Sequence, residues 1–151
     1  MNGILKVQDV FDVASYFLLL QDKDCGDFIS NLKLQKLCYY AQGIHLAITN
    51  QRLFDNDIEA WQHGPVVADL YFEYNQYGSS DIPVTPGFSS DIISVENREL
   101  LDDVYAEYGQ YSAWKLRNMT HCEPPWKRAI ERKERIISDQ DMIEFFKTQI
   151  C

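Results

Sequence analysis

The chain has 151 residues, of which 46% are hydrophobic and 13% are aromatic. This length suits one domain with a buried core, and the composition is too apolar for a disordered chain. The formal net charge of −9 at pH 7 argues against broad, nonspecific binding to phosphate backbones. We therefore expect a single domain over residues 1–151 that does not bind nucleic acid directly. Such an acidic chain stays soluble, and it also suits a basic partner.

No run of the sequence approaches the ~20 apolar residues that a membrane-spanning helix needs. The most apolar run, Val13–Leu20, contains Ser15 and Tyr16. The cysteines lack C-x-x-C spacing and a regular framework, which is typical of reduced thiols. They are Cys25, Cys38, Cys122 and Cys151. These patterns predict a cytoplasmic protein without a membrane partner.

Apolar residues at helical spacing predict three helices in the first half of the chain. The first covers residues 7–18, and the second begins at the capping residue Ser30 and closes near Thr49. The third runs over residues 66–77, where Gly78 ends it.

The stretch Glu59–Tyr71, which reads EAWQHGPVVADLY, is the most informative part of the chain. Gly64 tolerates positive φ, and Pro65 presets φ for a first helical turn. We therefore expect a short strand near residues 58–62, a turn at the Gly-Pro pair and a helix directly after it.

Trp61 and His63 have the same parity on this extended segment, so they are expected to point to one face. Such a corner is either a packing joint or a recognition surface. We expect Trp61 to plug the core, in which case Trp61→Ala would cost roughly 3–5 kcal/mol.

The second half is predicted to begin with a loop and to continue as helices. Residues 79–94 are rich in proline, glycine and serine, with candidate short strands at 82–85 and 92–95. Four helices are expected over residues 97–108, 112–119, 125–137 and 139–148, and Ser138 caps the last. The predicted fold is mainly α, a compact single-domain scaffold of about six to seven helices with a minor β element.

The candidate chemical groups do not form a recognisable catalytic or metal site. Structural zinc normally uses four ligands in close pairs. The only near pair here is the adjacent His121 and Cys122, with His63 far away in the sequence. Cys38 lies on the apolar face of a predicted helix, and the seven glycines form no phosphate-binding loop. We expect no catalytic, cofactor-binding or metal-binding residues.

Two groups of side chains are more ambiguous. Residues 127–135 read KRAIERKER, which suggests a basic helix face for an acidic partner or nucleic acid. We favour a solvated surface with i,i+4 ion pairs between Lys127 and Glu131 and between Glu131 and Arg135. The many tyrosines and tryptophans are expected to fill the core and its edge, with some of them facing a partner.

Three sequence blocks, taken together in their order and spacing, resemble the Panacea domain family. They are LKLQKLCYYAQG at residues 32–43, EAWQHGPV at 59–66, and a third that joins SAW at 112–114 to MTH at 119–121 and PWK at 125–127. The resemblance covers about residues 7–137. The third block departs from the family pattern, because a small residue would be expected before its Pro-Trp pair. The motif positions given a structural role are Leu34, Leu37, Tyr40, Ala41, Gln42, Gly43, Trp61, Gly64, Pro65, Thr120, Pro125 and Trp126.

This family includes SocA-like antitoxins and phage-associated GepA-like proteins. The resemblance implies a non-enzymatic antitoxin of a bacterium, prophage or phage, which neutralises a toxin by direct binding or delivers it to a AAA+ protease. The residues expected to face a partner are His63, Tyr74, Tyr77, Trp114 and His121.

Two alternative functions remain at this point. A phage or prophage effector could use the same scaffold to bind a host defence or regulatory protein. A metal-dependent enzyme could be built around His63, His121 and Cys122. The oligomeric state is open, because an exposed aromatic patch suits both a partner and a dimer.

Overall fold

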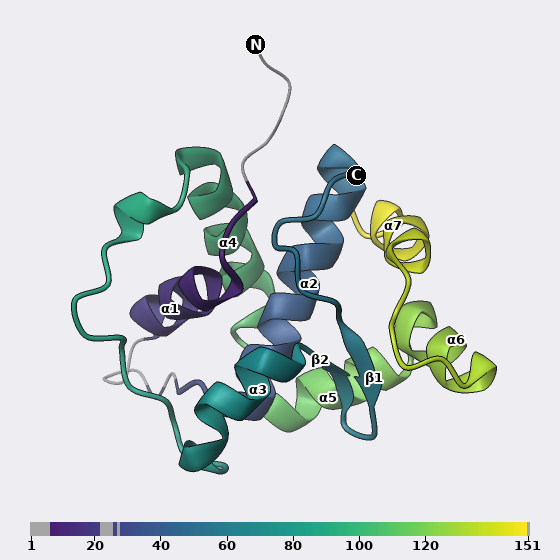
Figure 1. The fold of residues 1–151 in the computed structure, drawn as a ribbon, viewed down its shortest axis with the longest axis horizontal. Helices are drawn as coiled ribbons and strands as arrows, with labels where there is room; N and C mark the ends of the chain where they lie inside the picture. The colour runs from purple at the N-terminus through teal and green to yellow at the C-terminus, as the bar shows by residue number, and fades with distance from the viewer. Residues whose placement is uncertain (1–6, 22–25, 27, 151) are drawn as a thin grey trace.

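The computed structural model describes residues 7–21, 26 and 28–150. Figure 1 shows that helices dominate these residues and that two short strands form one hairpin. The helices are α1 (Val10–Leu20), α2 (Asn31–Thr49), α3 (Ala68–Tyr74), α4 (Val95–Tyr108), α5 (Ala113–His121), α6 (Pro124–Arg132) and α7 (Asp139–Lys147). The strands are β1 (Glu59–Trp61) and β2 (Gly64–Val66), and the 3-10 turns are η2 (Asn75–Tyr77) and η3 (Ser90–Ile92). The prediction of a mainly α scaffold with about six to seven helices and a minor β element is confirmed.

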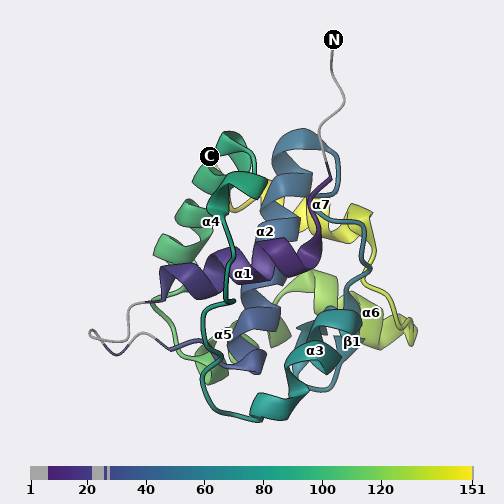
Figure 2. The ribbon, with the colours of Figure 1, turned by 60° about the vertical axis from the view of Figure 1, so that its left-hand side comes forward.

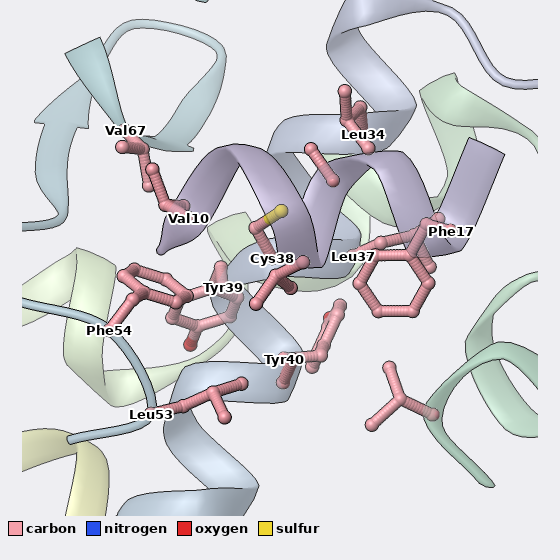
Figure 3. Close-up of a cluster of buried hydrophobic side chains, with 14 of the residues drawn as sticks. Val10, Phe17, Leu34, Leu37, Cys38, Tyr39, Tyr40, Leu53, Phe54 and Val67 are labelled. Atoms are coloured by element: carbon pink, nitrogen blue, oxygen red, sulfur yellow. The ribbon is translucent and has the colours of Figure 1, made fainter. Parts of the chain in front are cut away.

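Helix α2 forms the axis of the fold. Helices α1, α3, α4, α5 and α7 all contact it, and the two views show α1 crossing it at a steep angle (Figures 1 and 2). Its apolar residues Leu34, Leu37, Tyr40 and Ala41 are fully buried, and the side chains of α1 meet them in the core (Figure 3). Packing five helices against α2 removes most of its apolar surface from water, which is the main driving force for folding.

The buried amide of Gln42 fixes the segment that follows α2. Its Oε1 accepts hydrogen bonds from the backbone N–H groups of Leu53 at 2.8 Å and Phe54 at 3.2 Å. Its Nε2 donates to the Phe54 carbonyl oxygen at 2.8 Å. An amide whose donor and acceptor are both used can be buried at little cost. The family-motif glutamine therefore sets the path of the chain toward the hairpin.

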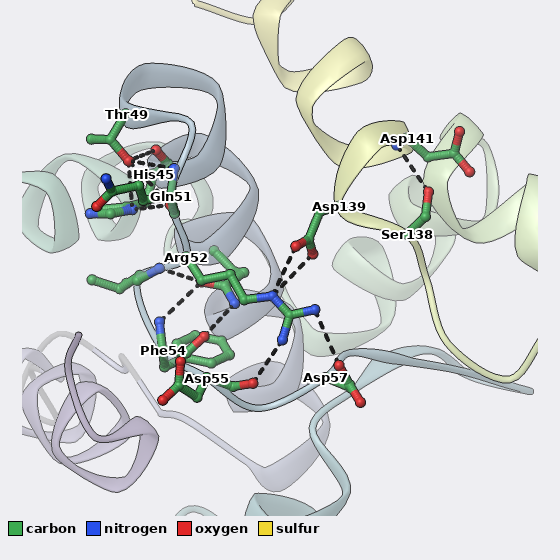
Figure 4. Close-up of polar contacts among 12 residues, drawn as sticks. His45, Thr49, Gln51, Arg52, Phe54, Asp55, Asp57, Ser138, Asp139 and Asp141 are labelled. Carbon is green, nitrogen blue, oxygen red and sulfur yellow. Dashed lines mark hydrogen bonds and ion pairs between the residues drawn. The ribbon is translucent and has the colours of Figure 1, made fainter. Parts of the chain in front are cut away.

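A second polar contact ties the same segment to α7. The Arg52 guanidinium donates to the Asp139 carboxylate at 2.9 Å, to the Asp55 carbonyl oxygen at 2.7 Å and to Asp57 at 3.1 Å (Figure 4). Next to it, His45 Nδ1 lies 2.7 Å from the Gln51 carbonyl oxygen. These bonds fix the loop between α2 and the hairpin from both sides.

The predicted helix starts at Ser30 and Ser138 are confirmed. The Ser30 hydroxyl accepts a hydrogen bond from the Lys33 N–H at 3.3 Å, and the Ser138 hydroxyl accepts one from the Asp141 N–H at 3.1 Å (Figure 4). Each cap supplies an acceptor for an N–H group that has no partner within the helix, typically worth ~1 kcal/mol.

The turn at the Gly-Pro pair differs from the prediction. Gly64 and Pro65 lie in β2, where Gly64 pairs with Trp61 and Pro65 with Ala60 in an antiparallel hairpin. The turn is made by the two residues between the strands, Gln62 and His63. Helix α3 therefore begins at Ala68 rather than at residue 66, and it ends at Tyr74 before η2. The predicted strand near residues 58–62 is therefore the first strand of a hairpin.

Three further predictions were wrong. Residues 82–85 form no strand, since Pro83 and Pro86 lack N–H donors. The predicted strand at 92–95 is also absent, because residues 90–92 form η3 and α4 begins at Val95. Helix α6 ends at Arg132 instead of residue 137, because Lys133 adopts a left-handed conformation with φ 57°. The chain then runs extended beside the hairpin, where Ile136 forms a bridge with Glu59.

The early end of α6 also changes the ion pairs of the basic stretch. Arg135 lies beyond the helix and pairs with Glu59 at 2.9 Å, so the predicted i,i+4 pair with Glu131 is wrong. Arg128 and Arg132 instead reach across to the Asp141 carboxylate on α7, at 3.2 and 3.0 Å. The basic residues thus join elements together.

No helix in the described part of the chain has the length and apolarity to cross a membrane.

Candidate partner-binding face

The hairpin sits directly on the buried side chain of Lys36. The Lys36 Nζ donates to the Pro65 carbonyl oxygen at 3.2 Å, and the side chain has no exposed surface. Burial, with a smaller contribution from the Arg117 charge, lowers the pKa of Lys36 to about 7. A buried cation without a carboxylate partner is costly, so the amine is readily neutral here.

Two more side chains hold the hairpin through its backbone. Trp126 Nε1 donates to the Trp61 carbonyl oxygen at 2.8 Å. Gln35 Oε1 accepts from the Val67 N–H at 2.9 Å, just before α3 begins. The hairpin is therefore fixed from α2 and from α6.

Trp61 is half-buried and does not plug the core, so that expectation was wrong. Its ring packs at an angle to those of Tyr71 and Phe72, with centroids 5.0 and 6.1 Å apart. Phe72 is 64% exposed. The hairpin register places the Trp61 side chain against the outer surface of α3 and not beneath the hairpin. The result is an aromatic cluster that reaches solvent.

A second cluster joins the hairpin turn to α5. Arg117 Nε donates to His63 Nδ1 at 3.2 Å, and the Arg117 guanidinium carbon lies 4.4 Å from the centre of the Trp114 ring. The His63 and Trp114 rings are 6.0 Å apart, and Trp114 is 55% exposed. A guanidinium at this distance from an indole face forms a cation–π contact. We call the surface formed by Trp61, His63, Tyr71, Phe72, Trp114 and Arg117 the hairpin face.

A pocket of about 390 Å³ lies on the hairpin face. Trp61, His63 and Tyr71 contribute to its lining, and Gln35 and Asn31 of α2 add polar groups. This combination of aromatic walls with a few polar groups suits a side chain inserted by a partner.

His121 lies at the edge of this region and is partly covered. Its ring stacks on Trp126 with centroids 4.0 Å apart and an interplanar angle of 4°. Its Nε2 is buried without a hydrogen-bond partner among the described residues. Burial, followed by the Arg117 charge, lowers the pKa of His121, so the ring is neutral at pH 7.

The five predicted partner-facing residues do not form one site. The structure brings His63 and Trp114 together and places His121 nearby. Tyr74 and Tyr77 instead lie at the end of α3 and in η2, with ring centroids 6.4 Å apart. Tyr74 is half-buried beside Ser15 and Thr85, so these two tyrosines belong to a different surface.

Four residues of the hairpin face were not singled out from the sequence as partner-facing: Trp61, which was assigned to the core, and Tyr71, Phe72 and Arg117. For Tyr71 and Phe72 the shortness of the predicted helix was a usable signal, and in the structure Leu70 is the only buried residue of the seven-residue helix α3. A helix this short buries one narrow stripe, which leaves the two positions after Leu70 outside the core. No comparable sequence signal marks Arg117, because its contacts with His63 and Trp114 depend on how the two hairpin strands pair.

The residues considered for metal or thiol chemistry are His63, His121 and the cysteines. Within the described ranges, no three His, Cys, Asp or Glu side chains are arranged to hold a metal ion. Cys38 is buried, and burial raises the pKa of its thiol, while Cys122 is exposed. Cys25 and Cys151 lie outside the described residues. Because burial holds the Cys38 thiol protonated, Cys38 is a poor nucleophile.

A half-buried carboxyl group joins α2 to the residue just before α6. Glu123 accepts hydrogen bonds from the Tyr39 hydroxyl at 3.0 Å and from the Tyr40 hydroxyl at 2.8 Å. Burial raises the pKa of Glu123 to about 7, although the two hydroxyl groups oppose this change. The Tyr40 ring also stacks on Tyr108 at 3.9 Å.

We predict that Glu123 makes stability pH-dependent on the acid side of neutrality. Between its ordinary pKa of 4.5 and its folded pKa of about 7, the folded protein binds the proton more tightly than the unfolded chain. The contribution of Glu123 to the free energy of unfolding therefore falls as the pH rises through this window, by at most ~1.4 kcal/mol per pH unit. Urea unfolding of Glu123→Gln from pH 4.5 to 7 should lack this contribution. The exposed Glu73→Gln serves as control, and equal slopes in all three proteins would contradict the prediction.

Because Trp61 is half-buried, we predict that Trp61→Ala lowers the free energy of unfolding by only about 1–2 kcal/mol. This is less than a core tryptophan would cost. Thermal unfolding measures the loss, and Leu37→Ala, at a fully buried position, provides a comparison of ~2–5 kcal/mol. A loss for Trp61→Ala that equals or exceeds that of Leu37→Ala would contradict the half-buried placement.

The motif positions that were given a structural role are mostly inside the fold. Leu34, Leu37, Tyr40, Ala41, Gln42, Gly43, Gly64, Pro65, Thr120 and Pro125 are buried, whereas Trp61 and Trp126 are half-buried. A helical scaffold that carries an exposed tryptophan and a half-buried arginine on one face has the character of a protein-interaction domain.

The comparison with known families agrees with this character. The family model described as antitoxin SocA-like, Panacea domain, matches residues 34–127, from α2 to the start of α6. The chain belongs to this antitoxin-like family. The assignment implies a protein partner such as a toxin and favours a non-enzymatic role. No curated protein and no solved structure gives a significant match.

Proposed function

We propose that this protein is an antitoxin that neutralises a partner toxin by direct binding through the hairpin face. The family match over residues 34–127 carries the proposal, because the matched region contains the hairpin and α5. Trp, Tyr and Arg are the residues that most often dominate binding energy at protein interfaces. On this face Trp61 and Tyr71 line a pocket, together with the polar side chains of Gln35 and Asn31.

The anchoring of the hairpin supports this role. Trp126 and Lys36 both bond to its backbone, so the face is ordered before a partner arrives. A preorganised surface loses less conformational entropy on binding. The net charge of −9 would also speed the encounter with a basic toxin and would make the association rate salt-dependent.

The test is co-expression with the product of the neighbouring gene. The wild-type protein should restore growth that the toxin inhibits, and purified proteins should form a complex. Trp114→Ala together with Arg117→Ala should abolish rescue while leaving the melting temperature nearly unchanged, because Trp114 is exposed and Arg117 is half-buried. The matched control is Val95→Ala with Arg98→Ala on α4, away from the hairpin. Full rescue by the first double variant would overturn the hairpin face as the binding site.

The same experiment separates neutralisation by blocking from delivery to a protease. With blocking, the toxin persists in the complex at an unchanged level. With delivery to a AAA+ protease, toxin half-life falls in the presence of the antitoxin and recovers in a protease-deficient strain. An absence of any effect on the neighbouring product would instead favour a role as an effector that binds a host protein.

A further inference from the structure

A groove lies between α2 and α4, away from the hairpin face. Its volume is about 670 Å³, which makes it larger than the pocket on the hairpin face. Its apolar surface comes from Ile44 and Ile48 of α2 and from Leu100 and Val104 of α4. Helices α2 and α4 contact each other along this line, and Figure 1 shows them side by side.

The apolar floor of the groove is open to solvent. Ile48 is 59% exposed, and Ile44, Leu100 and Ile150 are half-buried. A single exposed isoleucine is ordinary, but several apolar side chains that line one concave surface are typical of a binding site.

One edge of the groove is strongly acidic. Glu96, Glu99, Asp103 and Glu107 all line it and are all exposed. Their spacing along α4 places them on one helix face, beside the apolar positions Leu100 and Val104. None of the four forms an ion pair with another residue that the structure describes. No lysine or arginine is found among the described residues that line the groove.

We propose that this groove docks a basic amphipathic helix from a partner protein. Apolar side chains of that helix would cover Ile48 and Leu100, and its lysines or arginines would face Glu99 and Asp103. The acidic edge extends over the twelve residues from Glu96 to Glu107, a rise of about 17 Å or three turns, which sets the length of the occupant. Burial of apolar surface provides the affinity, and the acidic edge provides orientation and salt dependence.

This interaction is additional to the one proposed for the hairpin face, and the two can fail independently. The probe is a fluorescent peptide of about 14 residues, about four helical turns, with leucine on one face and lysine on the other. We expect binding to wild-type protein that weakens as salt is raised. Amide shifts in NMR spectra should change along α2 and α4 and not at the hairpin.

Two groove variants test the apolar and the acidic part separately. Ile48→Asn, and Glu99→Lys combined with Asp103→Lys, are each expected to weaken peptide binding roughly tenfold or more. Ile130→Asn matches the first substitution on an exposed site of α6. Glu73→Lys with Glu131→Lys matches the second, with the same change in net charge at exposed positions elsewhere. Both controls should bind within about twofold of wild type.

Three experimental results would overturn the proposal. Trp114→Ala should leave peptide binding unchanged, and a loss there would assign the peptide to the hairpin face and overturn the proposal. Equal losses of peptide affinity in the groove and control variants would show that binding depends only on net charge, and this would also overturn the proposal. If wild-type protein is a dimer by sedimentation and Ile48→Asn is a monomer, a second copy of this chain fills the groove and the proposal is wrong.

Discussion

Replacing Gly43 by alanine is expected to destabilise the protein by about 2 kcal/mol or more. Alanine is favoured over glycine in a helix by ~1 kcal/mol, so helix propensity alone predicts the opposite sign. At this position, however, the three atoms nearest to an added Cβ all belong to the Phe146 ring, which would overlap with it. Phe146 is fully buried, so its ring has no free space to move into.

A double-mutant cycle measured by urea unfolding would attribute the loss to this contact. Phe146→Leu shortens the side chain, and in that background Gly43→Ala should cost much less than it does in wild type. Stabilisation by Gly43→Ala in the wild-type background would show that α2 and α7 are not packed as described.

Replacing Gly64 by alanine is expected to cost about 3 kcal/mol, for two separate reasons. Gly64 has φ +107°, a conformation that L-amino acids rarely adopt. In addition, an added Cβ would lie 2.7 Å from Thr120 Oγ1 and 2.8 Å from Lys36 Cε. The substitution should therefore also displace the hairpin and reduce binding at the hairpin face.

Gly87 is a matched control for the conformational part of this effect. It has φ +74°, and nothing lies within 4 Å of an added Cβ. Gly87→Ala should cost only about 1 kcal/mol, and the larger cost of Gly64→Ala reflects its packing against Thr120 and Lys36 together with its larger φ. Equal costs in thermal unfolding would contradict the close contact beneath the hairpin.

Much of the helical framework could be predicted because its signals are local. The caps at Ser30 and Ser138, and the end of α2 at Thr49, follow from hydrogen bonds and periodicity within a few residues. The assignment of Cys38 to the interior followed in the same way from its place on an apolar stripe.

The hairpin and the end of α6 could not be predicted in this way. A Gly-Pro pair is compatible with a helix start and with a strand, and contacts with Lys36 and Trp126 decide between them. Nothing near Lys133 in the sequence stops α6, but bonding of the following residues to the hairpin does so. Such contacts between distant segments override local propensity.

The candidate site was predicted only in part for the same reason. His63 and Trp114 were expected to face a partner, and the structure places them together through Arg117. Trp61 was assigned to the core because large aromatic residues usually fill cores. Its position at the surface depends on the hairpin register, which no short-range pattern specifies.

Three anchors of the hairpin go to its main chain and not to its side chains. Trp126 bonds to the Trp61 carbonyl oxygen, Lys36 bonds to the Pro65 carbonyl oxygen, and the Ala60 N–H bonds to the Arg135 carbonyl oxygen. Every residue type except proline offers the same backbone groups, so the side chains of Gln62 and His63 can be exchanged without breaking any of these anchors. On the proposed hairpin face, exchanging these two residues would therefore change the binding surface without altering the contacts that support it.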